Sequence, residues 1–164
     1  MIPKQMLDAI NEQINAELYS AYMYLSMASY FEEKNFQGFA HWMEVQAHEE
    51  VEHAMKFYKY VNDRGERVIL KPIEGPPTEW ESPLAAFQAA YQHEQKVTSL
   101  INNLVKISRE LDDYATEAML DWFVTEQVEE EANASEIVEK LSMIRDNSNG
   151  MLMMDRTLGQ RGEH

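Results

Sequence analysis

The 164-residue sequence predicts an all-α protein, a four-helix bundle with a long crossover between its second and third helices and a short fifth helix near the C-terminus. Four long segments each carry apolar residues at alternating three- and four-residue steps, the spacing of one buried helix face. Short breaks join the first pair and the last pair, whereas a proline-containing stretch of about 20 residues separates the two pairs. The length suits one domain, with residues 1–145 forming the bundle and residues 150–159 the fifth helix.

The first predicted helix covers residues 3–34 and begins at Pro3, a residue suited to a first turn. The residues expected on its buried face form a stripe along the helix. This stripe contains one carboxylate, Glu17, and one amphipathic residue, Tyr24. The stripe consists of Leu7, Ile10, Ile14, Glu17, Ala21, Tyr24, Ala28 and Phe31. Lys34 and Asn35 form a tight break, so the next helix should fold back antiparallel.

The second predicted helix covers residues 36–63 and ends near Gly65, a candidate left-handed cap. Its stripe contains a carboxylate and an imidazole three residues apart, which places both on the same face. The stripe consists of Phe36, Phe39, Met43, Glu50, His53, Phe57 and Tyr60. A lone ionised carboxylate on a buried face costs several kcal/mol, roughly, unless a partner such as a metal ion neutralises it.

Residues 64–83 contain Pro72, Pro76, Pro77 and Pro83 and cannot form a long helix. About 18 extended residues reach roughly 55–60 Å, and a helix of about 28 residues is roughly 42 Å long. The stretch can therefore run the length of a bundle, which leaves the second and third helices parallel.

The third predicted helix begins at Ser82 and Pro83, a plausible cap and first-turn proline, and ends before a turn at residues 110–113. Glu94 is the one carboxylate in its stripe. The fourth helix covers residues 114–145, and Gln127 and Glu130 interrupt its stripe. The fifth helix is too short to be stable alone. We expect Met151, Leu152 and Leu158 to lack a surface within the chain and to pack against other subunits.

Each of the four stripes is thus broken near its middle, and in a bundle the breaks can meet at one depth. Four carboxylates there would balance two divalent cations. Oxygen-rich ligation with one imidazole fits iron or manganese better than a structural zinc site. The pattern approaches that of di-iron bundles, in which two helices each give a Glu and the other two each give Glu-x-x-His. The alternative is a set of unrelated polar residues.

The net charge of −15 argues against nucleic acid and anionic membranes as partners and favours cations. No Cys is present, so disulfides and thiolate ligands are excluded. The N-terminal MIPKQMLDAI has no long apolar segment, and no run approaches the roughly 18 apolar residues of a membrane span. We therefore expect no signal peptide, no membrane association and a cytoplasmic location.

Over almost its whole length the chain resembles the bacterial and archaeal non-haem ferritins. The similar segments are INAELYSAYMYLSMASYF, GFAHWMEVQAHEEVEHAMKF, GPPTEWESPLAAF and WFVTEQVEEEA. The resemblance implies an iron-storage protein and ferroxidase that oxidises Fe(II) with O2 or peroxide. It also implies a hollow homo-oligomeric cage of twenty-four subunits that holds the Fe(III) mineral.

The same resemblance implies roles for individual residues. Glu17, Glu50, His53 and Glu94 match the first and bridging ligands of a di-iron centre, with Glu50 the bridge. Glu130 matches a ligand of the second iron, with Gln127 close beside it, and Tyr24 matches a tyrosine next to the centre. A third iron position on the cavity side is matched by Glu49, Glu126 and Glu129.

The sequence departs from neighbouring families in two features. Gln127 and Glu130 stand where bacterioferritins have a second Glu-x-x-His, and Val51 stands where they have a haem-binding Met. We therefore expect no haem. Two other functions stay open: a di-iron oxidase or peroxidase that keeps its metals as a fixed cofactor, and a metal-free helical interaction module.

Overall fold

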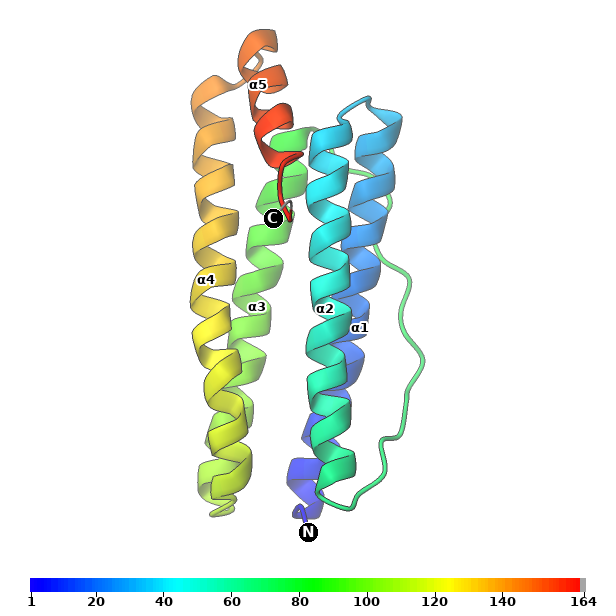
Figure 1. Ribbon diagram of the computed structural model, residues 1–164, viewed down its shortest axis with the longest axis vertical. Helices are drawn as coiled ribbons and strands as arrows, with labels where there is room; N and C mark the ends of the chain where they lie inside the picture. Colours follow the sequence, from blue (N-terminus) through cyan, green and yellow to red (C-terminus); the bar gives the residue numbers. More distant parts are fainter. Residues whose placement is uncertain (163–164) are drawn as a thin grey trace.

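The computed structural model describes residues 1–162, and the part of the chain that it describes contains helices and no strands. Four long helices lie side by side along one axis, and a short fifth helix lies at one end (Figure 1). The helices are α1 (Lys4–Glu33), α2 (Gln37–Asp63), α3 (Pro83–Glu110), α4 (Tyr114–Ile144) and α5 (Ser148–Leu158). The predicted all-α bundle is therefore confirmed, with helix ends within one or two residues of those expected for the first four.

The crossover between α2 and α3 runs along the outside of the bundle, so that α2 and α3 point the same way (Figure 1). It is tied to α1 by side chains of that helix. The Asn15 amide donates to the carbonyls of Lys71 and Pro72 at 3.2 and 3.0 Å, and Ser26 Oγ donates to the carbonyl of Pro77 at 2.6 Å. These bonds satisfy backbone carbonyls that an irregular segment leaves without helical partners.

The turns follow the backbone chemistry expected of their residues. Asn35 and Gly65, at the ends of α1 and α2, have positive φ angles of 65° and 80°. Ser82 caps α3 by accepting a bond from the Ala85 amide at 3.0 Å, and Pro83 is the first helical residue. None of the helices in residues 1–162 is both long and apolar enough to cross a membrane.

The apolar core has two parts, one toward each end of the bundle. In the half near α5, Phe31 packs against Phe39 and Phe87 with ring centroids 5.3 and 5.5 Å apart. In the other half, Phe57 stacks on Phe123 at 4.1 Å. The buried members of the predicted stripes fill both parts, which is why the helical period was a good guide to burial.

Helix α5 begins at Ser148, earlier than the expected residue 150, because Asn147 caps it by accepting a bond from the Gly150 amide at 2.8 Å. The helix then packs closely on the start of α2. A Cβ atom on Gly38 would lie only 1.7 Å from the Asp155 carbonyl oxygen, so this approach requires glycine. The Asp155 carboxylate accepts a bond from the Phe39 amide at 2.9 Å and so satisfies a free donor at the N-terminus of α2.

The expectation that the fifth helix lacks a surface within the chain is wrong for two of its residues. Leu158 is 9% exposed and belongs to the core near α5, and Met151 is half-buried against the same core. The glycine at position 38 creates this docking surface, and helical periodicity gave no sign of it. Leu152 does point outward, with 62% of its surface exposed.

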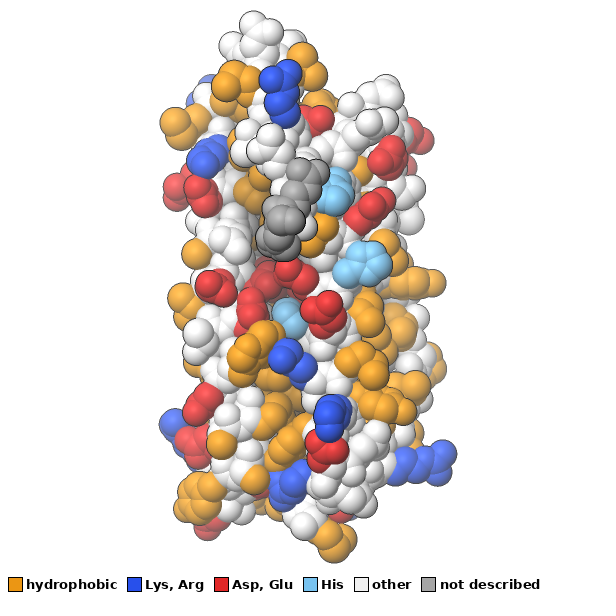
Figure 2. Space-filling view, viewed as in Figure 1, with side chains coloured by type: hydrophobic (Ala, Val, Ile, Leu, Met, Phe, Trp, Pro, Cys, Tyr) orange, Lys and Arg blue, Asp and Glu red, His pale blue; other side chains and the backbone are white. Residues whose placement is uncertain are grey.

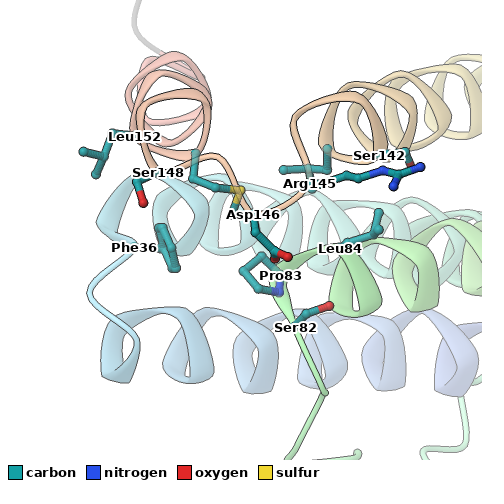
Figure 3. Close-up of a pocket in the computed structure, with 11 residues that line it drawn as sticks. Phe36, Ser82, Pro83, Leu84, Ser142, Arg145, Asp146, Ser148 and Leu152 are labelled. Atoms are coloured by element: carbon teal, nitrogen blue, oxygen red, sulfur yellow. The ribbon is translucent and has the colours of Figure 1, made fainter.

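A pocket of about 760 Å³ lies where α5 meets the ends of α2, α3 and α4 (Figure 3). Its walls include Phe36, Leu84, Arg145 and Leu152, a mixture of apolar and charged side chains. The pocket contains none of the carboxylates predicted to bind metal, so the candidate chemistry lies elsewhere in the bundle.

Candidate metal centre

A layer of polar side chains separates the two apolar halves of the core, and every member is 6% exposed or less. We call this set the polar layer. It consists of Glu17 from α1, Glu50 and His53 from α2, Glu94 from α3, and Gln127 and Glu130 from α4. The breaks in the four predicted stripes thus lie together at mid-height. Figure 2 shows acidic and histidine side chains gathered between α4 and α2 about halfway along the bundle.

Two overlapping groups of potential metal ligands share Glu50. One contains Glu17, Glu50 and His53, and the other contains Glu50, Glu94 and Glu130. Within each group the ligand atoms lie within 4.8 Å of one another. A carboxylate has two oxygens, so Glu50 can serve both groups and bridge two cations.

One atom of the layer has no hydrogen-bond partner. Glu17 Oε2 is buried and unbonded within the described residues. It lies 3.7 Å from His53 Nδ1, which is in turn 3.3 Å from Glu50 Oε2. A buried carboxylate oxygen without a donor is costly, and a divalent cation between Glu17, His53 and Glu50 would satisfy it. The donor set of carboxylates and one imidazole therefore fits such an ion.

Burial opposes ionisation of the carboxylates and raises their pKa values. The pKa of Glu50 rises to about 8, mainly through burial and against a favourable hydrogen bond with His53. Burial and the neighbouring Glu50 raise the pKa of Glu94 to about 8. Burial, Glu94 and Glu50 raise that of Glu130 to about 9. Without a cation, the layer therefore retains protons near neutral pH.

His53 and Tyr24 respond to the same negative surroundings. Burial alone would lower the pKa of His53, but its contacts with Glu17 and Glu50 outweigh burial and raise the pKa to about 11. The Tyr24 hydroxyl donates to Glu94 Oε2 at 2.6 Å, and burial together with Glu94 raises its pKa well above the usual value. Tyr24 therefore stays a neutral donor that orients one oxygen of Glu94.

Three glutamine amides hold the remaining carboxylate oxygens. Gln13 donates to Glu17 Oε1 at 3.0 Å, and Gln46 donates to Glu50 Oε1 at 2.9 Å and to Glu130 Oε2 at 2.7 Å. Gln127 donates to the Glu94 carboxylate oxygen Oε1 at 3.4 Å and also to the Glu94 backbone carbonyl at 3.2 Å. Gln13 and Gln46 were not among the predicted site residues, although each lies four residues before a carboxylate of the layer and therefore on the same helix face.

The three residues expected at a third iron position lie at different depths. Glu126 is half-buried and forms a group with His53 and Glu130, within 4.8 Å. Glu49 is half-buried and forms an ion pair with Arg161 at 3.0 Å. Glu129 is exposed and belongs to no ligand group among residues 1–162. The structure therefore brings Glu126 to the polar layer and leaves Glu49 and Glu129 outside it.

A four-helix bundle with a long crossover and a mid-height layer of glutamates and histidine defines the ferritin-like class. Comparison with known proteins agrees with this assignment. Residues 7–144 match the family described as the ferritin-like domain. Bacterial non-heme ferritin from Bacteroides fragilis is 44% identical, covering 98% of this chain and all of its own. The Staphylococcus saprophyticus protein of the same name is 40% identical over 98% of this chain and 96% of its own.

Among solved structures, the open pore ferritin of the hyperthermophilic archaeon Archaeoglobus fulgidus is 51% identical to this chain. The match covers 98% of this chain and 99% of that one, with a TM-score of 0.97. The chain therefore belongs to the ferritin family.

Proposed function

We propose that this ferritin oxidises Fe(II) at the polar layer and stores the Fe(III) as mineral inside a cage of its own subunits. The observation that carries the proposal is the position of Glu50, which belongs to both ligand groups and can hold two ions side by side. Iron is here the substrate. Two Fe(II) ions each lose one electron to O2, which takes up two protons and becomes H2O2. With H2O2 as oxidant, the same electrons and two protons give two waters.

The residues of the layer have distinct tasks in this scheme. Glu17 and His53 hold one Fe(II), Glu94 and Glu130 hold the other, and Glu50 lies between them. Because the pKa values of Glu50, Glu94 and Glu130 are raised by burial, binding of the two cations displaces protons from these carboxylates. Tyr24 fixes Glu94 through its hydroxyl. Apolar side chains above and below exclude bulk water.

Gln127 favours transient binding over a fixed cofactor. Its amide faces Glu94 where another class of di-iron bundle has a carboxylate, and an amide donates less charge to a cation. Iron at the Glu94 and Glu130 side should therefore be held loosely and pass on to the cavity by way of Glu126. We expect the variant Gln127→Glu with Glu130→His to retain about two irons per subunit through a chelator wash. If the wild type keeps its two irons as firmly as this variant, the result would instead favour a di-iron oxidase that retains its metals as a fixed cofactor.

Exposed apolar side chains support assembly into a cage. Tyr22 and Leu25 on α1, and Val51, Met55 and Tyr58 on α2, are each at least 36% exposed. Hydrophobic side chains extend over α2 on the face shown in Figure 2. Such a surface is typical of contacts between subunits. We propose a homo-oligomer of twenty-four subunits in the cytoplasm, and light scattering after size exclusion gives its mass.

The activity is tested by substituting one ligand. In stopped-flow assays, Glu17→Ala should slow oxidation of the first two Fe(II) ions per subunit by roughly 100-fold or more. This is at least the loss seen when groups merely supporting a metal ligand are removed. Glu32→Ala, which changes an exposed glutamate of the same helix, is the matched control. Equal initial rates for the two variants would exclude the polar layer as the site of oxidation.

A further inference from the structure

The turn after α5 places an arginine beside the polar layer, on the side where Glu49 lies. Arg161 Nη2 donates to Gln46 Oε1 at 2.7 Å and to Glu49 Oε2 at 3.0 Å, while Nη1 donates to the Trp42 carbonyl at 3.2 Å. Its guanidinium lies 4.3 Å from the centre of the Trp42 ring. The side chain is only 19% exposed. Arg161 therefore forms a fixed set of contacts along α2, in contrast to an ordinary surface arginine.

The docking of α5 holds Arg161 in this place. Asp155 binds the start of α2, Leu158 lies in the core, and the close approach of Gly38 joins the two helices. The Arg161 carbonyl also pairs with His41 Nε2 at 2.8 Å. The contacts of α5 with α2, together with the bond from His41 to the Arg161 carbonyl, fix this turn. The position of Arg161 therefore depends on the C-terminal helix.

Through Gln46, Arg161 decides which atom of an amide faces the carboxylates. A guanidinium only donates hydrogen bonds, so it must face the amide oxygen. The Gln46 nitrogen is then directed at Glu50 and Glu130, 2.9 and 2.7 Å away. If Arg161 were absent, the amide could turn and offer its oxygen, which is a ligand for hard cations.

Arg161 also neutralises Glu49. This carboxylate is one turn from His53 and has 39% of its side chain exposed, so it is accessible to cations from solvent. A third cation near Glu49 would have to displace the guanidinium or bind beside its positive charge. Both cost free energy, since like charges repel at short range.

We propose that Arg161 is a positioning residue that closes the Glu49 side of the centre and prevents a third cation from binding there. It does so by holding Gln46 as a donor and by occupying Glu49. The inference rests on the proposed function, because it takes the polar layer as the site of the cation pair. It assigns to the C-terminal turn a part in controlling when iron leaves that site.

The test counts Co(II) ions bound per subunit of the assembled protein by anaerobic calorimetry, with no oxidation involved. Wild type should bind two ions tightly. Arg161→Ala should bind a third, with its affinity raised roughly tenfold over any third ion on wild type, as loss of a nearby like charge predicts. Arg161→Lys, which keeps the charge, should restore two. Arg156→Ala, which changes an exposed arginine of α5, is the control and should match wild type.

A second variant distinguishes loss of the Arg161 contacts with Gln46 and Glu49 from a general loosening of the C-terminal turn. Glu49→Gln together with Arg161→Ala should lose the third ion again, which a merely disordered C-terminal turn would not predict. If Arg161→Ala binds the same number of ions with the same affinities as Arg156→Ala, the inference is wrong and the proposed function stands. If wild type binds no pair of ions, both are wrong.

Discussion

The half of the bundle near α5 buries Phe31 of α1 and Phe39 of α2, whereas the layer at mid-height buries Glu17 and Glu50 on the same two helices. Burial stabilises the first region by about 25 cal/mol for each Å² of apolar surface removed from water. In the second region burial destabilises charge and raises the carboxylate pKa values. Stability therefore comes from the apolar halves, which hold in place a layer whose buried carboxylates would be ionised and fully paired only with bound cations.

The largest expected effect comes from weakening the apolar half. Phe31→Ala removes a side chain with no exposed surface that packs on Phe39 and Phe87, and should lower the free energy of unfolding by about 3–5 kcal/mol. Denaturant unfolding gives this value, and Met143→Ala, at an 81% exposed position, is the control. The number of Co(II) ions bound should not change. A decrease in the free energy of unfolding no greater than that of the control would contradict the conclusion that the apolar halves supply the stability.

The next effect concerns pH in the cation-free protein. The pKa values of Glu50, Glu94 and Glu130 are raised to between about 8 and about 9, and that of His53 to about 11, so the folded state binds more protons than the unfolded one at neutral pH. Stability is then lost as pH rises through these folded-state values. His93, whose pKa burial lowers to about 4, acts with the opposite sign only below about pH 6.5.

We therefore expect the free energy of unfolding to fall by at least about 3 kcal/mol between pH 7 and 9, since one excess proton held by the folded state over these two pH units is worth about 2.7 kcal/mol. Denaturant unfolding at several pH values measures it. The double variant Glu50→Gln with Glu130→Gln should weaken the dependence of the free energy of unfolding on pH, whereas a dependence set by net charge alone would persist. Stability that increases over this pH range would be inconsistent with protonated carboxylates in the layer.

The smallest effect concerns the edge of the apolar half. Asp155→Ala removes the acceptor for the Phe39 amide at the start of α2 and should cost about 1 kcal/mol, the usual value of a helix cap. Thermal melting reveals it, with Asp146→Ala as an exposed control just before α5. If the two variants melt alike, the contact between α5 and α2 adds little to the stability of this half.

Helical periodicity predicted the four long helices and the meeting of Glu17, Glu50 and Glu94 at one depth, and the lengths of the connections predicted the antiparallel and parallel directions of the helices. It succeeded because a 3.6-residue period reports directly which face of a helix is buried. It also overstated burial for Phe36 and Tyr60, which are only half-buried at the helix ends.

The docking of α5 and the position of Arg161 could not be predicted in this way. Both depend on contacts between residues more than 100 positions apart, such as Gly38 with Asp155 and Gln46 with Arg161. Such contacts leave no local period in the sequence. Gln13 and Gln46 could have been found, because each precedes a stripe carboxylate by one helical turn.

The most direct test of the central claim is an anomalous X-ray map at the iron edge from crystals soaked anaerobically in Fe(II). We expect two iron peaks per subunit on either side of Glu50, one beside Glu17 and His53 and the other beside Glu94 and Glu130. The same soak of Glu17→Ala should lose the first peak. A wild-type map with no iron in the polar layer, or with a single ion that does not touch Glu50, would contradict the claim.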